Sequence, residues 1–110
     1  MTENIVICHY RPRADAVGSL LQLIREHRKV YREADLATDR PEYVYVGHEQ
    51  DGSGPLVITI FEWIDAEASA RAHQHPKIGP LWERMEALCE RRGDRPALDF
   101  PHFAEPEVLT

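Results

Sequence analysis

The distribution of apolar and polar residues along the chain predicts four strands and two helical segments. Short apolar or alternating runs with the period of a strand occur at 4–10, 43–49, 56–64 and 97–103. Apolar residues recur at helical spacing over 15–35 and again over 65–89, with an interruption at His75-Pro76. The interruption is expected because a residue that precedes proline is disfavoured in helical geometry. Asp15 and Asp65 are the expected N-caps of the two segments, and Gly93 is the expected end of the second.

The third run is the most informative of the strands. It places Leu56, Ile58 and Ile60 on one side. The other side carries Val57, Thr59, Phe61 and Trp63. Neither side is polar before Glu62, so both faces of this strand should be covered. The preceding segment 50–55, with the letters QDGSGP, predicts a turn that joins the two middle strands into an antiparallel hairpin.

The order of these elements is β-α-β-β-α-β, which is the split-βαβ, ferredoxin-like arrangement of an α+β protein. It implies a four-stranded antiparallel sheet with both helices on one face. A length of 110 residues predicts a single domain over 1–110, with a core over about 4–103 and a tail over 104–110. Pro101 suits an edge position for the last strand. Because the other sheet face is apolar, we expect two copies to stack through it as a homodimer.

Composition removes several classes of function. The formal net charge of −6 argues against a nucleic-acid partner, since that affinity depends on clustered Lys and Arg. No apolar run approaches the roughly 20 residues of a membrane span, and the first residues lack a signal-peptide pattern, so no membrane partner and a cytoplasmic location are expected. Cys8 and Cys89 lie inside apolar patterns, which predicts buried, reduced thiols.

One segment resembles a known family. A strand ending in Phe-Glu-Trp at 61–63 is followed by an acidic, alanine-rich helix, a His-x-His-Pro sequence at 73–76 and an amphipathic helix. This pattern resembles the antibiotic-biosynthesis-monooxygenase-type dimeric α/β barrels, and Glu62, Trp63 and His73 match it locally. The element order fits over about 4–103, and the likeness of individual residues is concentrated over 57–88. The resemblance implies a dimeric α/β barrel with a pocket for a small, planar organic molecule.

The same family includes cofactor-independent oxygenases, signal-molecule isomerases, haem-degrading enzymes and domains without an assigned activity. Fold alone therefore does not decide among them. The haem-degrading members use an Asn on the first strand, a Trp in the second helical segment and a His as the haem ligand. The matching positions here are Ala72 for the Trp and Trp82 for the His, and the nearest Asn is Asn4 at the very start of the strand. Haem breakdown is therefore not expected.

The leading hypothesis that the resemblance implies is a cofactor-independent monooxygenase for a phenolic or quinol-type substrate. Such an enzyme removes a proton from an electron-rich ring and lets the anion react with O₂ in a dry pocket. The candidate catalytic residues are His73, as a base near neutral pH, and Glu62. The candidate substrate-binding residues are Trp63, Trp82, Tyr45 and His9. No cofactor is expected.

Alternatives remain for each of these residues. Trp63 and Trp82 also fit core packing, and Glu62 lies on the opposite strand face from Trp63, so only one of the two can line a pocket on the helix side. No metal is expected, because His73 and His75 diverge by roughly 200° on a helix. The alternative function is a non-catalytic ligand-binding or structural dimer of the same fold, in which these side chains serve packing and the interface.

Overall fold

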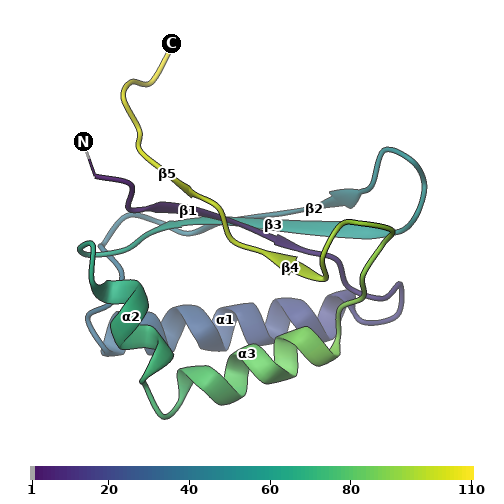
Figure 1. The fold of residues 1–110 in the computed structure, drawn as a ribbon, viewed down its shortest axis with the longest axis horizontal. Helices are drawn as coiled ribbons and strands as arrows, with labels where there is room; N and C mark the ends of the chain where they lie inside the picture. The colour runs from purple at the N-terminus through teal and green to yellow at the C-terminus, as the bar shows by residue number, and fades with distance from the viewer. Residues whose placement is uncertain (1) are drawn as a thin grey trace.

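An antiparallel sheet lies on a layer of helices in the computed structural model, which describes residues 2–110 (Figure 1). The elements follow one another as β1 (Ile5–Tyr10), α1 (Val17–Glu33), β2 (Tyr43–His48), β3 (Pro55–Glu62), α2 (Ala68–His73), α3 (Ile78–Ala87), β4 (Leu98–Asp99) and β5 (His102–Phe103). The sheet order is β2-β3-β1-β4, and β5 also pairs with β1. This is the predicted α+β, ferredoxin-like arrangement. Within residues 2–110, no helix is long and apolar enough to cross a membrane.

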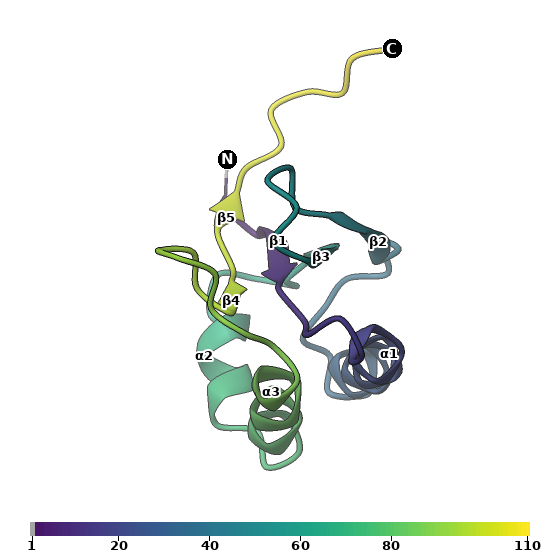
Figure 2. The ribbon, with the colours of Figure 1, turned by 90° about the vertical axis from the view of Figure 1, so that its right-hand side faces the viewer.

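The helices divide the covered face of the sheet between them. Figure 2 shows α1 beneath the side of the sheet formed by β2 and β3, and α2 and α3 beneath the side formed by β4 and β5. The break at His75-Pro76 separates α2 from α3, as the sequence predicts. After Phe103 the chain continues to Thr110 without regular secondary structure and leads away from the helices.

The last predicted strand is divided into two, which gives five strands instead of four. Its register against β1 is nevertheless continuous, since His9 pairs with Asp99 and Val6 pairs with His102. The carbonyl of Pro101, between the two pieces, accepts a hydrogen bond from the Ile7 amide at 3.1 Å. Proline has no amide hydrogen to donate to the ladder, so the regular strand is interrupted over residues 100–101 on the outer edge.

Both helical segments are shorter than the sequence predicts. Ala16, not Asp15, is the N-cap of α1, and Asp65 lies before the N-cap of α2, although it accepts a hydrogen bond from the Glu67 amide at 3.0 Å. The helix α3 ends at Ala87, several residues before Gly93. The reason is tertiary: the backbone beyond α3 exchanges hydrogen bonds with the segment 11–13, which replaces the helical pattern.

The two faces of the sheet differ in what covers them. Alternate residues of β1 and β3 point toward the helices and form the core with α1 and α3. The opposite face carries Ile5, Ile7, His9, Leu56, Ile58, Ile60 and Glu62, together with Tyr43 and Tyr45 of β2. No helix covers the β2 part of this face in the described residues 2–110, and there Tyr43 is 51% exposed and Tyr45 is 56% exposed.

A buried ionic cluster ties three loops together at one end of the domain. Arg11, after β1, donates to Glu49 at 2.8 Å, and both side chains are less than a tenth exposed. Arg92 lies 3.7 Å from the same carboxylate and donates to the carbonyls of Pro12 and Pro55. Because a buried charge is costly without a partner, this cluster fixes the ends of the β2–β3 hairpin against the loops that follow β1 and α3.

Candidate functional site

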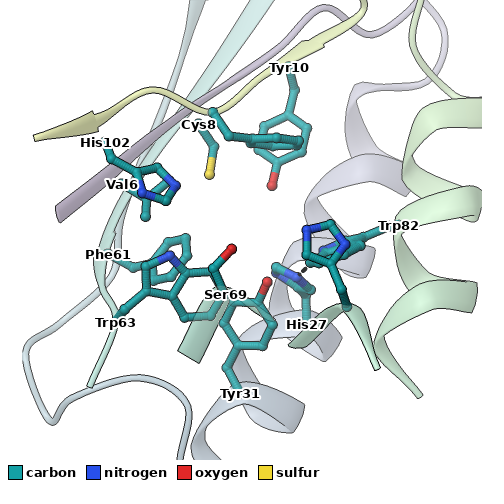
Figure 3. A pocket seen from close by; sticks show the side chains of 12 residues that line it. Val6, Cys8, Tyr10, His27, Tyr31, Phe61, Trp63, Ser69, Trp82 and His102 are labelled. Atoms are coloured by element: carbon teal, nitrogen blue, oxygen red, sulfur yellow. Dashed lines mark hydrogen bonds between the residues drawn. The ribbon is translucent and has the colours of Figure 1, made fainter. Parts of the chain in front are cut away.

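A cavity of about 170 Å³ lies between the sheet and the three helices (Figure 3). Its lining comes from every layer of the fold and consists of Val6, Cys8, Tyr10, His27, Tyr31, Phe61, Trp63, Ser69, His73, Trp82, Phe100 and His102. None of these residues is Asp, Glu, Lys or Arg, so the wall carries no fixed charge. A mostly apolar hollow with a few convergent polar groups is the usual form of a small-molecule site.

The deep end of the cavity is a cluster of aromatic rings. The ring of Tyr31 lies 5.3 Å from that of Phe61 and 5.0 Å from that of Trp63, and the last two are 4.9 Å apart in an edge-to-face arrangement. Trp63 is only 6% exposed, and its Nε1 donor is buried without a hydrogen-bond partner. An unpaired donor of this kind costs free energy unless a guest supplies an acceptor.

The rim is formed by residues from α2, α3 and the C-terminal edge. His73 and Trp82 meet edge to face with their ring centroids 4.7 Å apart. From the other side, the continuous register of the edge strands brings Phe100 and His102 alongside β1, on the helix face of the sheet. His73, Phe100 and His102 are exposed, whereas the deep aromatic residues are buried, so the cavity opens between α2 and the C-terminal edge.

Trp82 is held in place by a histidine that lies below it. Its Nε1 donates to Nε2 of His27, on α1, at 2.8 Å, as the dashed line in Figure 3 shows. His27 is 3% exposed and packs against Tyr31, with the ring centroids 3.9 Å apart and the ring planes tilted by 50°. Burial lowers the pKa of His27 to about 3 because the charged imidazolium would lose its hydration. The ring is therefore neutral at physiological pH and serves as a hydrogen-bond acceptor.

Three further polar groups in the wall are kept protonated. Burial raises the pKa of the Cys8 thiol to about 12, and it raises the pKa of both Tyr10 and Tyr31 well above the ordinary range. In Figure 3 the sulfur of Cys8 and the hydroxyl of Tyr10 lie on the sheet side of the space, with Tyr31 on the opposite side. These groups can donate hydrogen bonds to a guest, but they are poor bases.

The structure brings three of the six predicted site residues together. His73, Trp63 and Trp82 line the cavity. The other three, His9, Tyr45 and Glu62, lie on the opposite face of the sheet because of strand alternation. Within one chain they do not reach the cavity. Glu62 accepts a hydrogen bond from Thr38 at 3.0 Å and pairs with Arg40 at 3.4 Å, so this carboxylate is paired as a buried or half-buried acid requires.

Several residues that line the cavity were not predicted from the sequence as site residues. His27 and Tyr31 lie on the apolar stripe of α1, three and seven residues after Ile24, and that spacing could have placed His27 on the buried side. Phe100 and His102 carried no such signal, because their contact with the cavity depends on the pairing of the C-terminal edge with β1. Among residues 2–110, no group of three or more His, Cys, Asp or Glu side chains is placed to hold a metal ion.

No known family model matches the chain, and no curated protein matches it. Solved structures do. A variant of SnoaB, a cofactor-independent oxygenase from Streptomyces nogalater, superposes with a TM-score of 0.71 at 14% identity, covering 98% of both chains. Rv0793 from Mycobacterium tuberculosis gives 0.65 at 19% identity over 96% of this chain and 97% of that one. A structure described as an antibiotic biosynthesis monooxygenase gives 0.65 at 18% identity over 94% and 98%.

At sequence identities below 20%, the likeness establishes the fold but not the reaction, which has to be argued from the residues of the site. It spans almost the whole chain, from β1 through the C-terminal edge strands, and it agrees with the resemblance that the 57–88 segment predicts. This chain therefore has the fold of the antibiotic biosynthesis monooxygenases.

Proposed function

We propose that the protein is a cofactor-independent monooxygenase that binds a planar phenolic or quinol-type molecule in this cavity. The observation that carries the proposal is the uncharged aromatic wall with its unpaired Trp63 donor, together with a histidine, His73, at the rim. A neutral planar ring fits such a wall, and an oxygen of that ring fits the donor. One of the fold neighbours is described as a cofactor-independent oxygenase, which supports the same reaction class.

The proposed chemistry starts with removal of a proton from the bound ring system by His73. The anion then gives one electron to O₂, and recombination of the resulting radical with superoxide forms a new carbon–oxygen bond. Protonation and loss of water from the peroxide leave a carbonyl on the ring. Trp63 and the protonated hydroxyls of Tyr10 and Tyr31 stabilise the oxyanion, because donors fixed in a dry site need no reorganisation.

Oxygen uptake with hydroquinones and anthrones, repeated with a chelator, tests this function. Wild type should consume O₂, and His73→Gln should lower kcat by about 100-fold, as expected for loss of a general base. His48→Gln, at an exposed histidine of β2 outside the cavity, is the matched control and should leave the rate unchanged. If O₂ uptake resists the chelator and has the same rate in His73→Gln and His48→Gln, then His73 is not the base.

A homodimer through the open sheet face is the second part of the proposal. It is supported by the row of Ile, Leu and Tyr side chains on that face, because an exposed apolar patch of this kind usually meets a partner. Tyr45 and Val46 are neighbours on β2, are 56% and 54% exposed, and point to opposite faces. Tyr45→Glu should therefore shift the mass in light scattering toward the monomer, whereas Val46→Glu should not. Equal effects would contradict this interface.

A further inference from the structure

The volume of the cavity limits the size of the molecule that it can enclose. The cavity measures about 170 Å³. An apolar cavity of roughly 150 Å³ engineered into another protein binds one benzene molecule. The space here is therefore sufficient for one aromatic ring with its oxygen substituents, and a second fused ring exceeds it.

The deep walls are fixed in place, so the cavity does not widen easily. Tyr31 and Phe61 are buried, and their rings pack against that of Trp63 at 5.0 Å and 4.9 Å between centroids. A core packed in this way has little free volume into which its side chains could move. On the other side, Trp82 is held by its hydrogen bond of 2.8 Å to the buried His27.

Phe100 limits the length of the space at its mouth. It lies in the link between β4 and β5, and its ring meets that of Tyr10 edge to face at 5.9 Å between centroids. The ring lines the cavity and is also 41% exposed to solvent. Removal of this ring would therefore lengthen the space toward the opening and leave the deep aromatic cluster intact.

Polar groups lie at both ends of the space. Figure 3 shows Trp63 and Trp82 on opposite sides of it. Nε1 of Trp63 is a buried donor without a hydrogen-bond partner within residues 2–110. His73 lies beside Trp82, with 4.7 Å between the ring centroids. A ring held between the two ends can place one oxygen at the Trp63 indole and an oxygen from its opposite side at the imidazole of His73.

We propose that the cavity selects a neutral molecule with a single aromatic ring and two oxygens para to each other, as in 1,4-hydroquinone. The proposal rests on the proposed function, whose substrate it narrows from phenols and quinols in general to one-ring 1,4-diphenols. One oxygen accepts a hydrogen bond from Trp63, and the other donates to His73. In a linear tricycle such as anthrone the oxygen is on the middle ring, so a terminal ring that enters first keeps that oxygen away from Trp63.

The wall also selects against charged substituents. No Lys or Arg lines the cavity, so a bound carboxylate would lose its hydration without meeting a counter-charge. The pair 4-hydroxybenzamide and 4-hydroxybenzoate tests this, because the two have nearly the same shape. The amide should bind about tenfold more tightly or better in calorimetry at about pH 8, above the usual range of histidine titration. Equal affinities would contradict the selection for neutral molecules.

The size limit is tested by calorimetric binding of 1,4-hydroquinone and 2,6-dihydroxynaphthalene to the whole protein without O₂. The naphthalene also carries an oxygen at each end, but it is one ring longer. Hydroquinone should bind about tenfold more tightly, although burial of apolar area alone predicts the reverse order. Binding of the naphthalene that is as tight or tighter, or hydroquinone that does not bind, would overturn the proposal.

Variants of the wall assign the selection to particular residues. Phe100→Ala should tighten binding of the naphthalene about tenfold, because it lengthens the space. Phe103→Ala is the matched control, since Phe103 is 43% exposed on the same edge and points to the open sheet face with its register partner Ile5. Trp63→Phe should weaken hydroquinone about tenfold and leave p-xylene, which has no oxygen, unchanged.

Equal responses to the two phenylalanine substitutions, or equal losses for hydroquinone and p-xylene, would overturn the assignment. If a variant does not fold, the order of the ligands in wild type decides. Oxygen uptake separates the proposal from the oxygenase function. Selective binding of hydroquinone without O₂ uptake would refute the oxygenase function and support the size limit. Faster uptake with anthrone than with hydroquinone would support an oxygenase and overturn the size limit.

Discussion

The hydrogen bond between Trp82 and His27 makes the stability of the domain sensitive to acid. Nε2 of His27 accepts from the Trp82 indole, so it has to be unprotonated. Protonation would break this bond and place an unpaired charge at a site that is 3% exposed. The substitution that tests this is His27→Gln, because the glutamine oxygen can accept the same hydrogen bond but does not titrate.

The magnitude follows from the pKa of His27, which burial lowers from 6.5 to about 3. The unfolded chain therefore binds more protons than the folded one between these values, and the free energy of unfolding falls as the pH decreases below 6.5. Each pH unit costs about 1.4 kcal/mol, so a decrease to about pH 4 removes about 3 kcal/mol in wild type and none of this contribution in the variant. Above pH 6.5 the contribution is fully present.

Urea unfolding of both proteins at about pH 7 and about pH 4 measures the difference, and taking the change between the two pH values cancels every other titrating group. His27→Gln is expected to lose stability at neutral pH, because it gives up the ring contact with Tyr31. Between about pH 7 and about pH 4, its stability relative to wild type should rise by about 3 kcal/mol. His48→Gln, at an exposed position, should have the same stability as wild type at both pH values. A constant difference between His27→Gln and wild type would show that His27 is not held neutral by its surroundings.

Three further substitutions test the buried ionic cluster and the backbone. Glu49→Gln removes the carboxylate that Arg11 and Arg92 share. It should cost about 3 kcal/mol or more of unfolding free energy in urea, since it leaves the buried guanidinium of Arg11 without a counter-charge. A loss below about 1 kcal/mol would mean that solvent reaches the cluster. Gly54→Ala should lower the melting temperature, because Gly54 has a φ of +152° and an added Cβ would lie 2.5 Å from the Arg92 guanidinium. Gly18→Ala on α1 should instead raise stability by up to about 1 kcal/mol, because a Cβ there meets nothing within 4 Å. Equal effects of the two alanines would contradict this account.

The sequence could predict the fold because local patterns encode it. Period-two and helical spacing identified the elements, and the Asp-Gly turn identified the hairpin. The apolar residues on both sides of β3 predicted one face that packs on the helices, as observed, and a second apolar face whose cover within a dimer stays a prediction. The ends of the helices were less well predicted. They depend on competition between helical hydrogen bonds and long-range ones, such as those that replace the helix after Ala87.

The sequence identified only part of the candidate site, and the reason is geometric. Alternation along β3 separated Trp63 from Glu62 without any structure, and the structure agrees with that separation. Residues on α2 and α3 could be tied to Trp63 because they are near it in the chain. His102, Tyr10 and His27 could not, since they converge on it from the C-terminal edge, the first strand and the first helix.

What the sequence determined by itself is the order, type and two-faced character of the elements, because these depend on side chains a few residues apart. Only the tertiary structure decided which polar groups are buried, which are paired and which face the cavity. Burial holds His27 neutral, keeps the thiol of Cys8 protonated and brings the pKa of Glu42 near neutrality. Each of these shifts arises from desolvation by residues distant in the chain, and desolvation has no local signature in the sequence.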